Sequence, residues 1–309
     1  MGIGLNSVHL ICSSLDDIHG MASRRDKYIL TLGVQDCYFD YKTLVDFLRK
    51  HKFKHREVPP GNIKLNAGFN FSDVLKKKYA NNVHQDTLFD VLGFSVENVE
   101  SMDVMGEEHP TYVHDLNCPV PEETKSRYDI IIDGGTCEHI FSTKDVVANL
   151  ISMTKIGGLV IHHSPSDCIN HGFMNFNGEF FDSAYRVNGF DSLCMKYIFT
   201  PYYDRKAMDS YYIEYACSAV STVLQPYFVM NFYGVFRKTK EVEFRIPIQG
   251  ELREVSNAAT FSSTGFPVGR WNRPGTLTGW LITQIDKSVF LAFIVRSLYQ
   301  RQKGRRVNL

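Results

Sequence analysis

The chain has 309 residues, of which 44% are hydrophobic, so it can bury one large core or one core with an appended lobe. Lys and Arg total 34, as do Asp and Glu, so no net charge favours nucleic acid or another strongly charged partner. The seven cysteines include no C-x-x-C pair, and we find neither a signal peptide nor an apolar stretch of 18 residues, so we expect a cytoplasmic protein without a transmembrane segment.

The first predicted elements are a strand and several helical segments. "KYILTLGV" (27–34) predicts a short buried strand that ends at a glycine, and the apolar spacing of "YKTLVDFLRKH" (41–51) predicts a helix. Residues 57–68 form a loop by their Pro, Gly and Asn content. Two further helical segments follow, for which Ser72 and Asp86 are the candidate caps.

Four short strands then follow at the spacing of an α/β protein. They lie at residues 98–102, 111–115, 128–133 and 158–163. Between the last two we expect an amphipathic helix with Ser142 as its N-cap and Gly157-Gly158 as its stop. Strand, helix and strand with continuous Ile and Val runs indicate parallel strands that are covered on both faces.

The last predicted elements extend the sheet and then give way to loops. Two more strands are expected over 192–203 and 227–238, and the second has the pattern of an antiparallel edge strand. After about residue 240 the sequence is rich in loop residues, and a helix is expected only over 284–302.

Polar residues follow the strands at their carboxyl ends. They are Asp103, Asp115, Asp133 with Gly134 and Gly135, and finally His162, His163 and Ser164. An open α/β sheet binds its ligands at this edge, where the strand order changes direction. A ligand site is therefore expected there.

Four motifs occur in order along the chain: "VESMDV", "VHDLNCPVP", "YDIIIDGGTCEHIF" and "HGFMNFNGEFF". Together they resemble the class I S-adenosylmethionine-dependent methyltransferases, and more narrowly a bacterial branch associated with surface-polysaccharide biosynthesis. The resemblance covers about residues 27–240. It implies a Rossmann-like α/β domain over 1–240, whose sheet is mostly parallel with an antiparallel edge strand and has helices on both faces. Residues 34–97 are then a long insert between the first two strands, and 241–309 are a C-terminal extension.

The resemblance also implies residues for the methionine end of S-adenosylmethionine. Gly33 would approach the methionine part, and Asp133 with Gly134 would face the methionine and the sulfonium, where glycine permits close approach of the backbone. The sequence departs from the family at the G-x-G-x-G turn, because "GVQDCYF" has a single glycine. The narrower branch carries a glutamine at the position of Gln35, which we include among the candidate cofactor residues.

Three further residues are implied for the adenosine end of the cofactor. Asp103 would accept hydrogen bonds from both ribose hydroxyls, a task that suits a carboxylate. Asp115 would accept from the adenine amine, while Leu116 would pack on the ring.

The activity implied by the resemblance is methyl transfer to a hydroxyl or amine of a small polar acceptor, a sugar or polysaccharide precursor in particular. The alternative is a catalytically degenerate fold that serves as a binding or assembly subunit, a role that fits the incomplete glycine turn and the long insert. A nucleotide-sugar enzyme is disfavoured because no G-x-G-x-x-G motif is present to hold a pyrophosphate.

Two histidines are the candidates for taking a proton from the acceptor. His171 lies in a loop where the acceptor would arrive, and general-base help of this kind is worth about 10²–10⁴ in rate. His139 either assists as a base or packs at a helix start. Glu138 either forms a general-base or substrate-orienting pair with His139 or is a first-turn residue that complements the helix dipole, and we favour the second interpretation. In the alternative interpretation, His171 only stabilises its loop.

No metal is predicted, because no His or Cys pair has the spacing of zinc ligands, although a weakly held divalent ion among Asp and His at the strand ends stays open. His162 and His163 are neighbours on a strand and therefore point to opposite faces.

Residues 288–306 are apolar and then basic, and they either dock on an anionic membrane or pack on the domain or a second subunit. We favour packing, and a homo-oligomer is one form it would take. The expected partner is a small-molecule or saccharide acceptor and no nucleic acid.

Overall fold

The computed structural model describes most of the first 248 residues and little beyond them. The described residues are 2–16, 21–66, 80–168, 171–201, 211–214, 228–248 and 268–270. The helices predicted after Ser72 and over 284–302, and the apolar-then-basic segment 288–306, lie outside them. Among the described helices, none combines the length and the apolar character that crossing a membrane requires.

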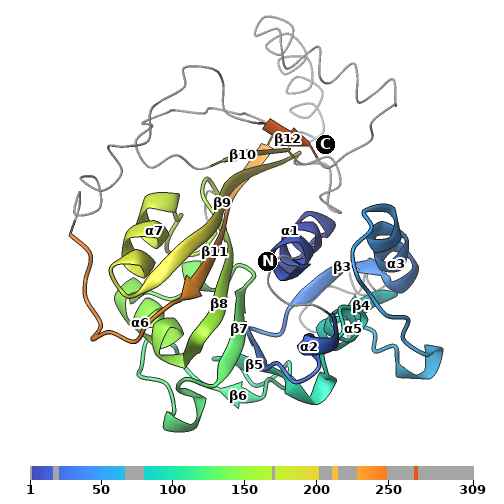
Figure 1. The fold of residues 1–309 in the computed structure, drawn as a ribbon, viewed down its shortest axis with the longest axis horizontal. Coiled ribbons are helices and arrows are strands. Elements are labelled where there is room, and N and C mark those ends of the chain that lie inside the picture. The colour runs from blue at the N-terminus through green and yellow to red at the C-terminus, as the bar shows by residue number, and fades with distance from the viewer. Residues whose placement is uncertain are drawn as a thin grey trace, which may run out of the picture.

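A large twisted sheet forms the centre of the described structure (Figure 1). Its strands are β2 (Ile29–Leu32), β5 (Val99–Asp103), β6 (Tyr112–Val113), β7 (Tyr128–Asp133), β8 (Thr154–Pro165), β9 (Phe190–Pro201), β10 (Tyr211–Glu214), β11 (Phe228–Lys238) and β12 (Val268–Arg270). Their order across the sheet is β12-β10-β9-β11-β8-β7-β2-β5-β6. The pairs β6–β5, β5–β2, β2–β7 and β7–β8 are all parallel.

The strand order confirms the predicted fold class. Counted along the chain from β2, the parallel strands lie in the doubly wound order 3-2-1-4-5, and β11 and then β9 continue the sheet beyond β8. The antiparallel pairings lie toward one edge, because β11 pairs antiparallel with both β8 and β9. Residues 228–238 are not themselves the outermost strand, however. Their apolar side chains on both faces, such as Phe232 and Tyr233, are fully buried, which suits an interior position.

Alternate residues of the central strands build two separate cores. On β7, Ile130 and Ile132 belong to the core on one face, whereas Ile131 belongs to the core on the other. This division follows from the two-residue repeat of a strand. A strand that is apolar on both faces must be covered on both, as the continuous isoleucine run predicts.

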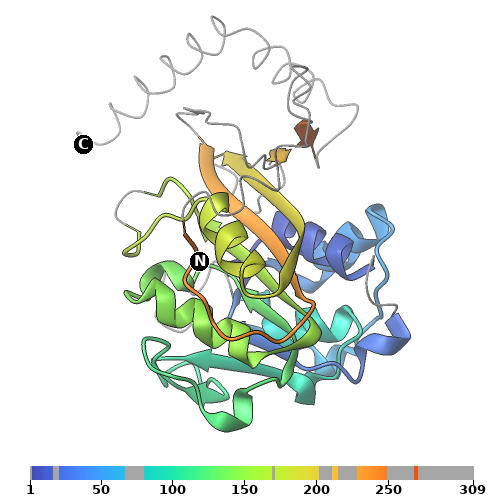
Figure 2. The same cartoon turned by 60° about the vertical axis from the view of Figure 1, so that its left-hand side comes forward.

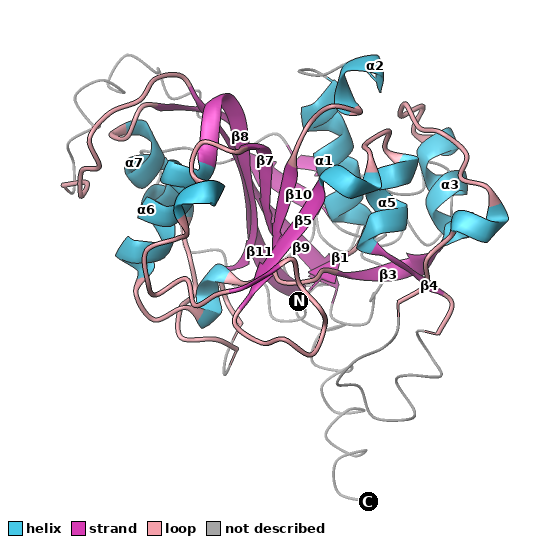
Figure 3. Ribbon diagram, turned by 90° about the horizontal axis from the view of Figure 1, so that it is seen from below, coloured by secondary structure: helices cyan, strands magenta, loops and turns pink. Residues whose placement is uncertain are grey.

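Helices cover both faces of the sheet. They are α1 (Leu5–Asp16), α2 (Met21–Arg24), α3 (Tyr41–Lys50), α5 (Gln85–Val91), α6 (Thr143–Met153) and α7 (Gly178–Arg186), with 3-10 turns η1 (Pro60–Asn62), η2 (Val96–Asn98), η3 (Glu122–Thr124) and η4 (Cys137–His139). Figures 1 and 3 place α6 and α7 on one face and α1, α3 and α5 on the other. In Figure 2 the α6–α7 side comes forward.

The segment between β2 and β5 builds a second, small sheet. Its strands β3 (Asp36–Asp40) and β4 (Asn82–His84) are antiparallel, and β1 (Gly2–Ile3) from the N-terminus joins β3 in parallel. The helix after β4 begins earlier than predicted. His84, rather than Asp86, is its N-cap, because the His84 side chain accepts a hydrogen bond from the Asp86 backbone N–H.

Helix α6 also differs from its predicted bounds at the C-terminal end. Ser142 is the N-cap residue as expected, but the helix ends at Met153, and β8 already begins at Thr154. The two glycines do not stop a helix. Tyr128 pairs with Thr154 and Ile130 with Leu159, so the residues between, with Gly157 at φ +83°, form an irregularity within β8.

Candidate functional site

The carboxyl ends of β2, β5 and β7 meet at Gly33. Its backbone N–H donates to the Met102 carbonyl on β5 at 2.7 Å, and the Thr136 hydroxyl donates to the Leu32 carbonyl at 2.7 Å. Gly33 has φ +73°, and a Cβ there would lie 3.3 Å from Asp103 Oδ2 and 3.4 Å from Thr136 Oγ1. The structure therefore brings together the strand ends at which the sequence predicts a site, at the point where the strand order reverses.

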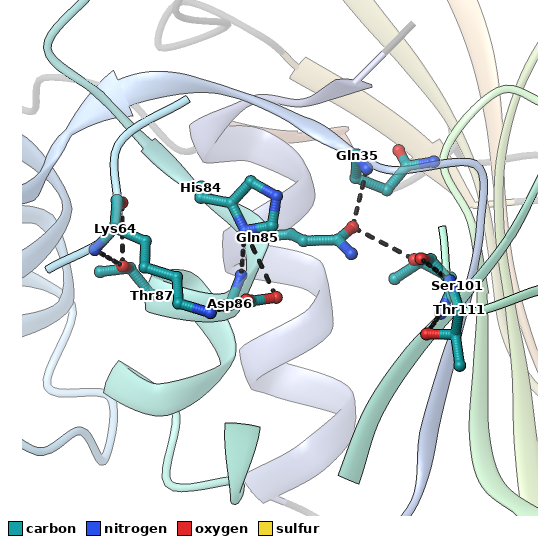
Figure 4. A network of polar contacts seen from close by, with 9 residues as sticks. Gln35, Lys64, His84, Gln85, Asp86, Thr87, Ser101 and Thr111 are labelled. Atoms are coloured by element: carbon teal, nitrogen blue, oxygen red, sulfur yellow. Dashed lines mark hydrogen bonds and ion pairs between the residues drawn. The ribbon is translucent and has the colours of Figure 1, made fainter. Parts of the chain in front are cut away.

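Gln35 fills the space between the ends of β2 and β7. Its backbone N–H donates to Gln85 Oε1 at 2.7 Å (Figure 4), and its side-chain amide donates to the Leu32 carbonyl. A Cβ on Gly134 would lie only 2.0 Å from Gln35 Oε1, so glycine is what lets the glutamine lie there. That oxygen is buried and has no hydrogen-bond partner within the described residues. A ligand donor at this position would satisfy it.

Asp133 points away from this space and into the protein. Its Oδ1 accepts backbone N–H bonds from Gly135, Thr136 and Cys137, and its Oδ2 lies 2.8 Å from His162 Nδ1. Burial alone would raise the pKa of Asp133, but the hydrogen bonds and charge of His162 outweigh it and hold that pKa well below its usual range. Asp133 thus fixes the turn that carries Gly134.

Asp115 and Leu116, the two residues expected beside an adenine ring, differ in their exposure to solvent. Asp115 is exposed and accepts hydrogen bonds from the backbone and side-chain amides of Asn117, which lower the pKa of Asp115. Leu116 is buried at 4% exposure in the core under α6, so its side chain is committed to packing there.

A cavity of about 450 Å³ opens between the insert and the loop after β5, with Val34 and Asp36, the neighbours of Gln35, in its lining. Its lining includes Asp36 on β3, His84 on β4, and Glu108 in the loop after β5. Burial, together with the carboxylates of Asp36 and Asp103, raises the pKa of Glu108. The lining thus holds three carboxyl groups, those of Asp36, Asp86 and Glu108, together with Lys64 and two histidines, so it can accept and donate hydrogen bonds.

Three residues of the polar network in Figure 4, Lys64, His84 and Asp86, line this cavity from the insert. Lys64 Nζ lies 2.8 Å from Asp86 Oδ2, and His84 Nδ1 accepts from the Asp86 N–H at 3.2 Å. Gln85 turns from the same helix start toward Gln35 and also accepts from the Thr31 hydroxyl at 3.1 Å. The N-terminus of α5 thus links the insert to the end of β2.

A second polar cluster lies beyond β7 and consists of Glu138, His139 and His171. Their candidate ligand atoms all lie within 4.8 Å of one another. Glu138 lies in the first turn of the 3-10 turn η4, as a helix-start residue would, but η4 is separate from α6, so Glu138 does not complement the dipole of that helix. Its side chain is fully buried, and burial together with the charge of Asp133 raises the pKa of Glu138 to about 8.

His139 and His171 are brought together by the fold although they come from different segments. Their ring centroids are 4.8 Å apart in an edge-to-face arrangement. The adjacent pair on β8 divides as predicted: His162 bonds to Asp133 and to the Tyr185 hydroxyl, whereas His163 faces Ser7 on α1.

Glu138 was weighed from the sequence as a candidate base beside His139 and set aside in favour of a structural role, because a carboxylate next to a histidine in a turn rich in glycine is a weak signal. The residues of the cavity were not found from the sequence. The cavity residues Asp36 and His84 lie on strands too short to show a period, and their pairing across β3 and β4 has no signature in the sequence.

Comparison with known proteins gives no family model and no curated protein that matches the chain. Solved methyltransferase structures resemble it distantly. A 1,6-didemethyltoxoflavin-N1-methyltransferase from Burkholderia thailandensis, solved with S-adenosylhomocysteine, has 10% identity and a TM-score of 0.34 over 78% of this chain and 92% of its own. A 16S rRNA (adenine(1408)-N(1))-methyltransferase from Catenulisporales acidiphilia has 9% identity and a TM-score of 0.37 over 74% and 94%. Scores this low carry no inference about what this chain binds or does.

Proposed function

We propose that the protein transfers a methyl group from S-adenosylmethionine to a hydroxyl or amine of a small polar acceptor, with a sugar or polysaccharide precursor as the favoured class. The observation that carries the proposal is the meeting of the ends of β2, β5 and β7 at the switch point of a doubly wound sheet, with Gly33, Asp103 and Gln35 at the junction. Of the four sequence motifs that resemble class I methyltransferases, "VESMDV" and "YDIIIDGGTCEHIF" end β5 and β7, whereas "VHDLNCPVP" follows β6 and "HGFMNFNGEFF" leads into α7.

The residues present fit the cofactor at both ends of the junction. Asp103, half-buried at the end of β5, is the acceptor for the ribose hydroxyls. The unpartnered Gln35 Oε1 is the acceptor for the ammonium of the methionine part, and Gly134 keeps the backbone close. Asp115 is the acceptor for the adenine amine, whereas the Leu116 side chain packs in the core instead of on the ring, and Asp133 supports the site from behind. The cofactor supplies a methyl group already activated on a sulfonium.

The protein's own contribution is to position the acceptor and to take its proton. The side chains of His171 and His139 have exposed fractions of 35% and 46%, although the Nε2 atom of His171 is itself buried. A base placed within hydrogen-bond reach of the acceptor contributes about 10²–10⁴ in rate. The carboxylates of the cavity beside Gln35 favour ligands rich in hydroxyl donors, as ribose and saccharides are.

One observation favours the second candidate, a degenerate fold that acts as a binding or assembly subunit. The Gln35 side chain occupies the space over Gly134 in the described structure. For the enzyme, this side chain must move or share that space with the ligand. For the degenerate fold, it replaces the ligand.

Calorimetric titration with S-adenosylmethionine and S-adenosylhomocysteine separates the two candidates. We expect micromolar binding that Asp103→Ala abolishes and that the matched control Asp46→Ala, on the exposed face of α3, leaves intact. His171→Ala should spare cofactor binding and slow turnover. If neither ligand binds the unaltered protein at high micromolar concentration, the methyltransferase proposal fails and the subunit candidate takes its place.

A further inference from the structure

The Glu138 carboxylate lies in a place where a carboxylate is costly unless something binds it. Its side chain is fully buried, and neither Oε1 nor Oε2 has a hydrogen-bond partner within the part of the chain that is described. An unpaired polar group of this kind costs several kcal/mol of stability when charged (roughly 2–7 kcal/mol even for a neutral group). Native proteins rarely keep such a group without a use for it.

Two imidazoles flank this carboxylate. His171 Nε2 lies 3.4 Å and His139 Nε2 lies 3.7 Å from Glu138 Oε1. Neither contact has the geometry of a hydrogen bond, and His171 Nε2 also lacks a partner among the described atoms. Ligand atoms around a zinc-like ion sit about 2.0–2.2 Å from it, so separations of roughly 3–4 Å between them are those of one coordination sphere.

Backbone contacts hold the loop that carries His171 against the turn that carries Glu138. The Glu138 carbonyl accepts N–H bonds from Phe173 at 2.7 Å and from Met174 at 3.3 Å. Gly172, at φ +73°, lies so close that a Cβ on it would be 2.7 Å from the Glu138 carbonyl oxygen. The loop that carries His171 is therefore fastened to the same residue whose side chain its imidazole approaches.

We propose that Glu138, His139 and His171 form a binding site for a divalent transition-metal ion. Two imidazoles and one carboxylate suit Zn²⁺, Fe²⁺, Co²⁺ or Mn²⁺, and three protein ligands leave positions open for water or another ligand. The Glu138 carboxylate and the His171 Nε2 atom are buried, whereas the two imidazole rings as wholes are partly exposed. An ion there provides the partner that the buried carboxylate lacks.

A second group with metal-ligand atoms, Asp133, Cys137 and His162, does not share this property. Both Asp133 oxygens and both His162 ring nitrogens have hydrogen-bond partners, the last of them the Tyr185 hydroxyl at 2.8 Å. This group is complete without an ion. The contrast singles out the Glu138 cluster.

The proposal goes beyond methyl transfer and does not depend on it. With the ion bound, His139 and His171 are ligands rather than bases, so metal binding also decides between two roles for these residues. The full-length protein is stripped with EDTA and titrated with Zn²⁺ and Mn²⁺ by calorimetry, and with Co²⁺ followed by its visible absorption. No S-adenosylmethionine is present, so the outcome is separate from that of the cofactor titration.

We expect one ion per chain, and at least about 100-fold weaker binding in Glu138→Gln, His139→Asn and His171→Asn, since loss even of outer-shell partners costs about 10–100-fold. His55→Asn, on the insert, is the matched control and should bind as the unaltered protein does. Circular dichroism identifies any variant that fails to fold, and Glu138→Gln conserves shape. The proposal is overturned if the unaltered protein binds none of the three ions below about 100 μM, or if folded ligand variants bind as tightly as the control.

Discussion

Asp133 shows how far a single residue determines the geometry of the site. Its carboxylate is fully buried and accepts bonds from three backbone amides, from His162 and from the Ser164 hydroxyl. The turn after β7, which presents Gly134 on one side and Glu138 on the other, is thus built around this carboxylate. We expect Asp133 to act on ligands through that turn.

Replacing Asp133 by alanine should cost about 3–5 kcal/mol of unfolding free energy, because it breaks a buried pair with His162 and strands several amide donors. Urea denaturation measures the loss. Asp133→Asn keeps one acceptor oxygen and should lose less, and Asp46→Ala on the exposed surface should stay within about 0.5 kcal/mol. A loss below 1 kcal/mol for Asp133→Ala would show that this carboxylate does not organise the turn.

The buried His163 should make the unfolding free energy of the protein sensitive to acid. Burial lowers the pKa of His163 from 6.5 to about 4, and Ser7 Oγ lies 2.8 Å from its Nδ1. Between pH 6.5 and 4 the unfolded chain therefore binds a proton that the folded protein does not. Stability should fall as the pH drops through this window, by up to about 3 kcal/mol from this residue.

Chemical unfolding at a series of pH values, for the unaltered protein and for His163→Asn, isolates this contribution. The variant should lose part of the slope between pH 6.5 and 4. His55→Asn should keep the full slope because His163 is intact in it. Equal slopes in all three proteins would show that His163 titrates in the folded state as it does in the unfolded chain.

The loop that carries His171 is the element on which both the acceptor base and the metal site depend. Gly172 has a positive φ and packs against the Glu138 backbone, whereas Gly157 in β8 has a similar φ of +83° with nothing within 4 Å of a Cβ. Alanine substitutions at the two positions therefore distinguish the cost of backbone strain, which both share, from the cost of a close contact, which only Gly172 has.

Alanine at Gly157 should cost only the strain of a left-handed residue, about 1 kcal/mol, whereas Gly172→Ala should cost about 2–3 kcal/mol, since the loop must also move away from Glu138. Thermal and urea unfolding give these values. Gly172→Ala should also weaken Co²⁺ binding, which Gly157→Ala should not. If the two variants lost the same unfolding free energy and bound Co²⁺ equally well, the loop that carries His171 would not be held against the Glu138 backbone.

Secondary structure was predictable where a side-chain period ran unbroken. The isoleucine run of β7 and the amphipathic spacing of α6 gave the strand and the helix correctly. The end of α6 was not predictable, because Gly157 and Gly158 stop a helix as readily as they permit an irregular strand, and only pairing with β7 decides between the two. The interior place of β11 likewise depends on a partner, β9, that lies far away in the sequence.

At the scale of the whole molecule, the sequence indicated the doubly wound sheet but not what covers it. The three strands of the small sheet come from residues 2–3, 36–40 and 82–84, and each is too short to show a period. Helix α1, which was not predicted, contributes to the core that packs on one face of the main sheet (Figure 3). The strand-end residues Gly33, Asp103 and Gly134 were predictable, since the topology alone brings such ends together.

The site could be predicted only in part for the same reason. Residues at strand ends are found from the fold class, but a contact such as that of Gln35 with Gly134 depends on the exact path of the turn. The burial of Glu138 depends on how the loop after β8 folds back over it. Neither follows from the residue types.

A crystal structure with S-adenosylhomocysteine tests the central claim most directly. The proposed function predicts the ligand across the ends of β2, β5 and β7, with its ribose hydroxyls on Asp103 and its ammonium bonded to Gln35 Oε1, which now has no partner among the described residues. The Gln35 side chain should have moved from its place over Gly134. A structure in which Gln35 keeps that place and no ligand lies beside Asp103, in crystals soaked at millimolar concentration, would contradict the account.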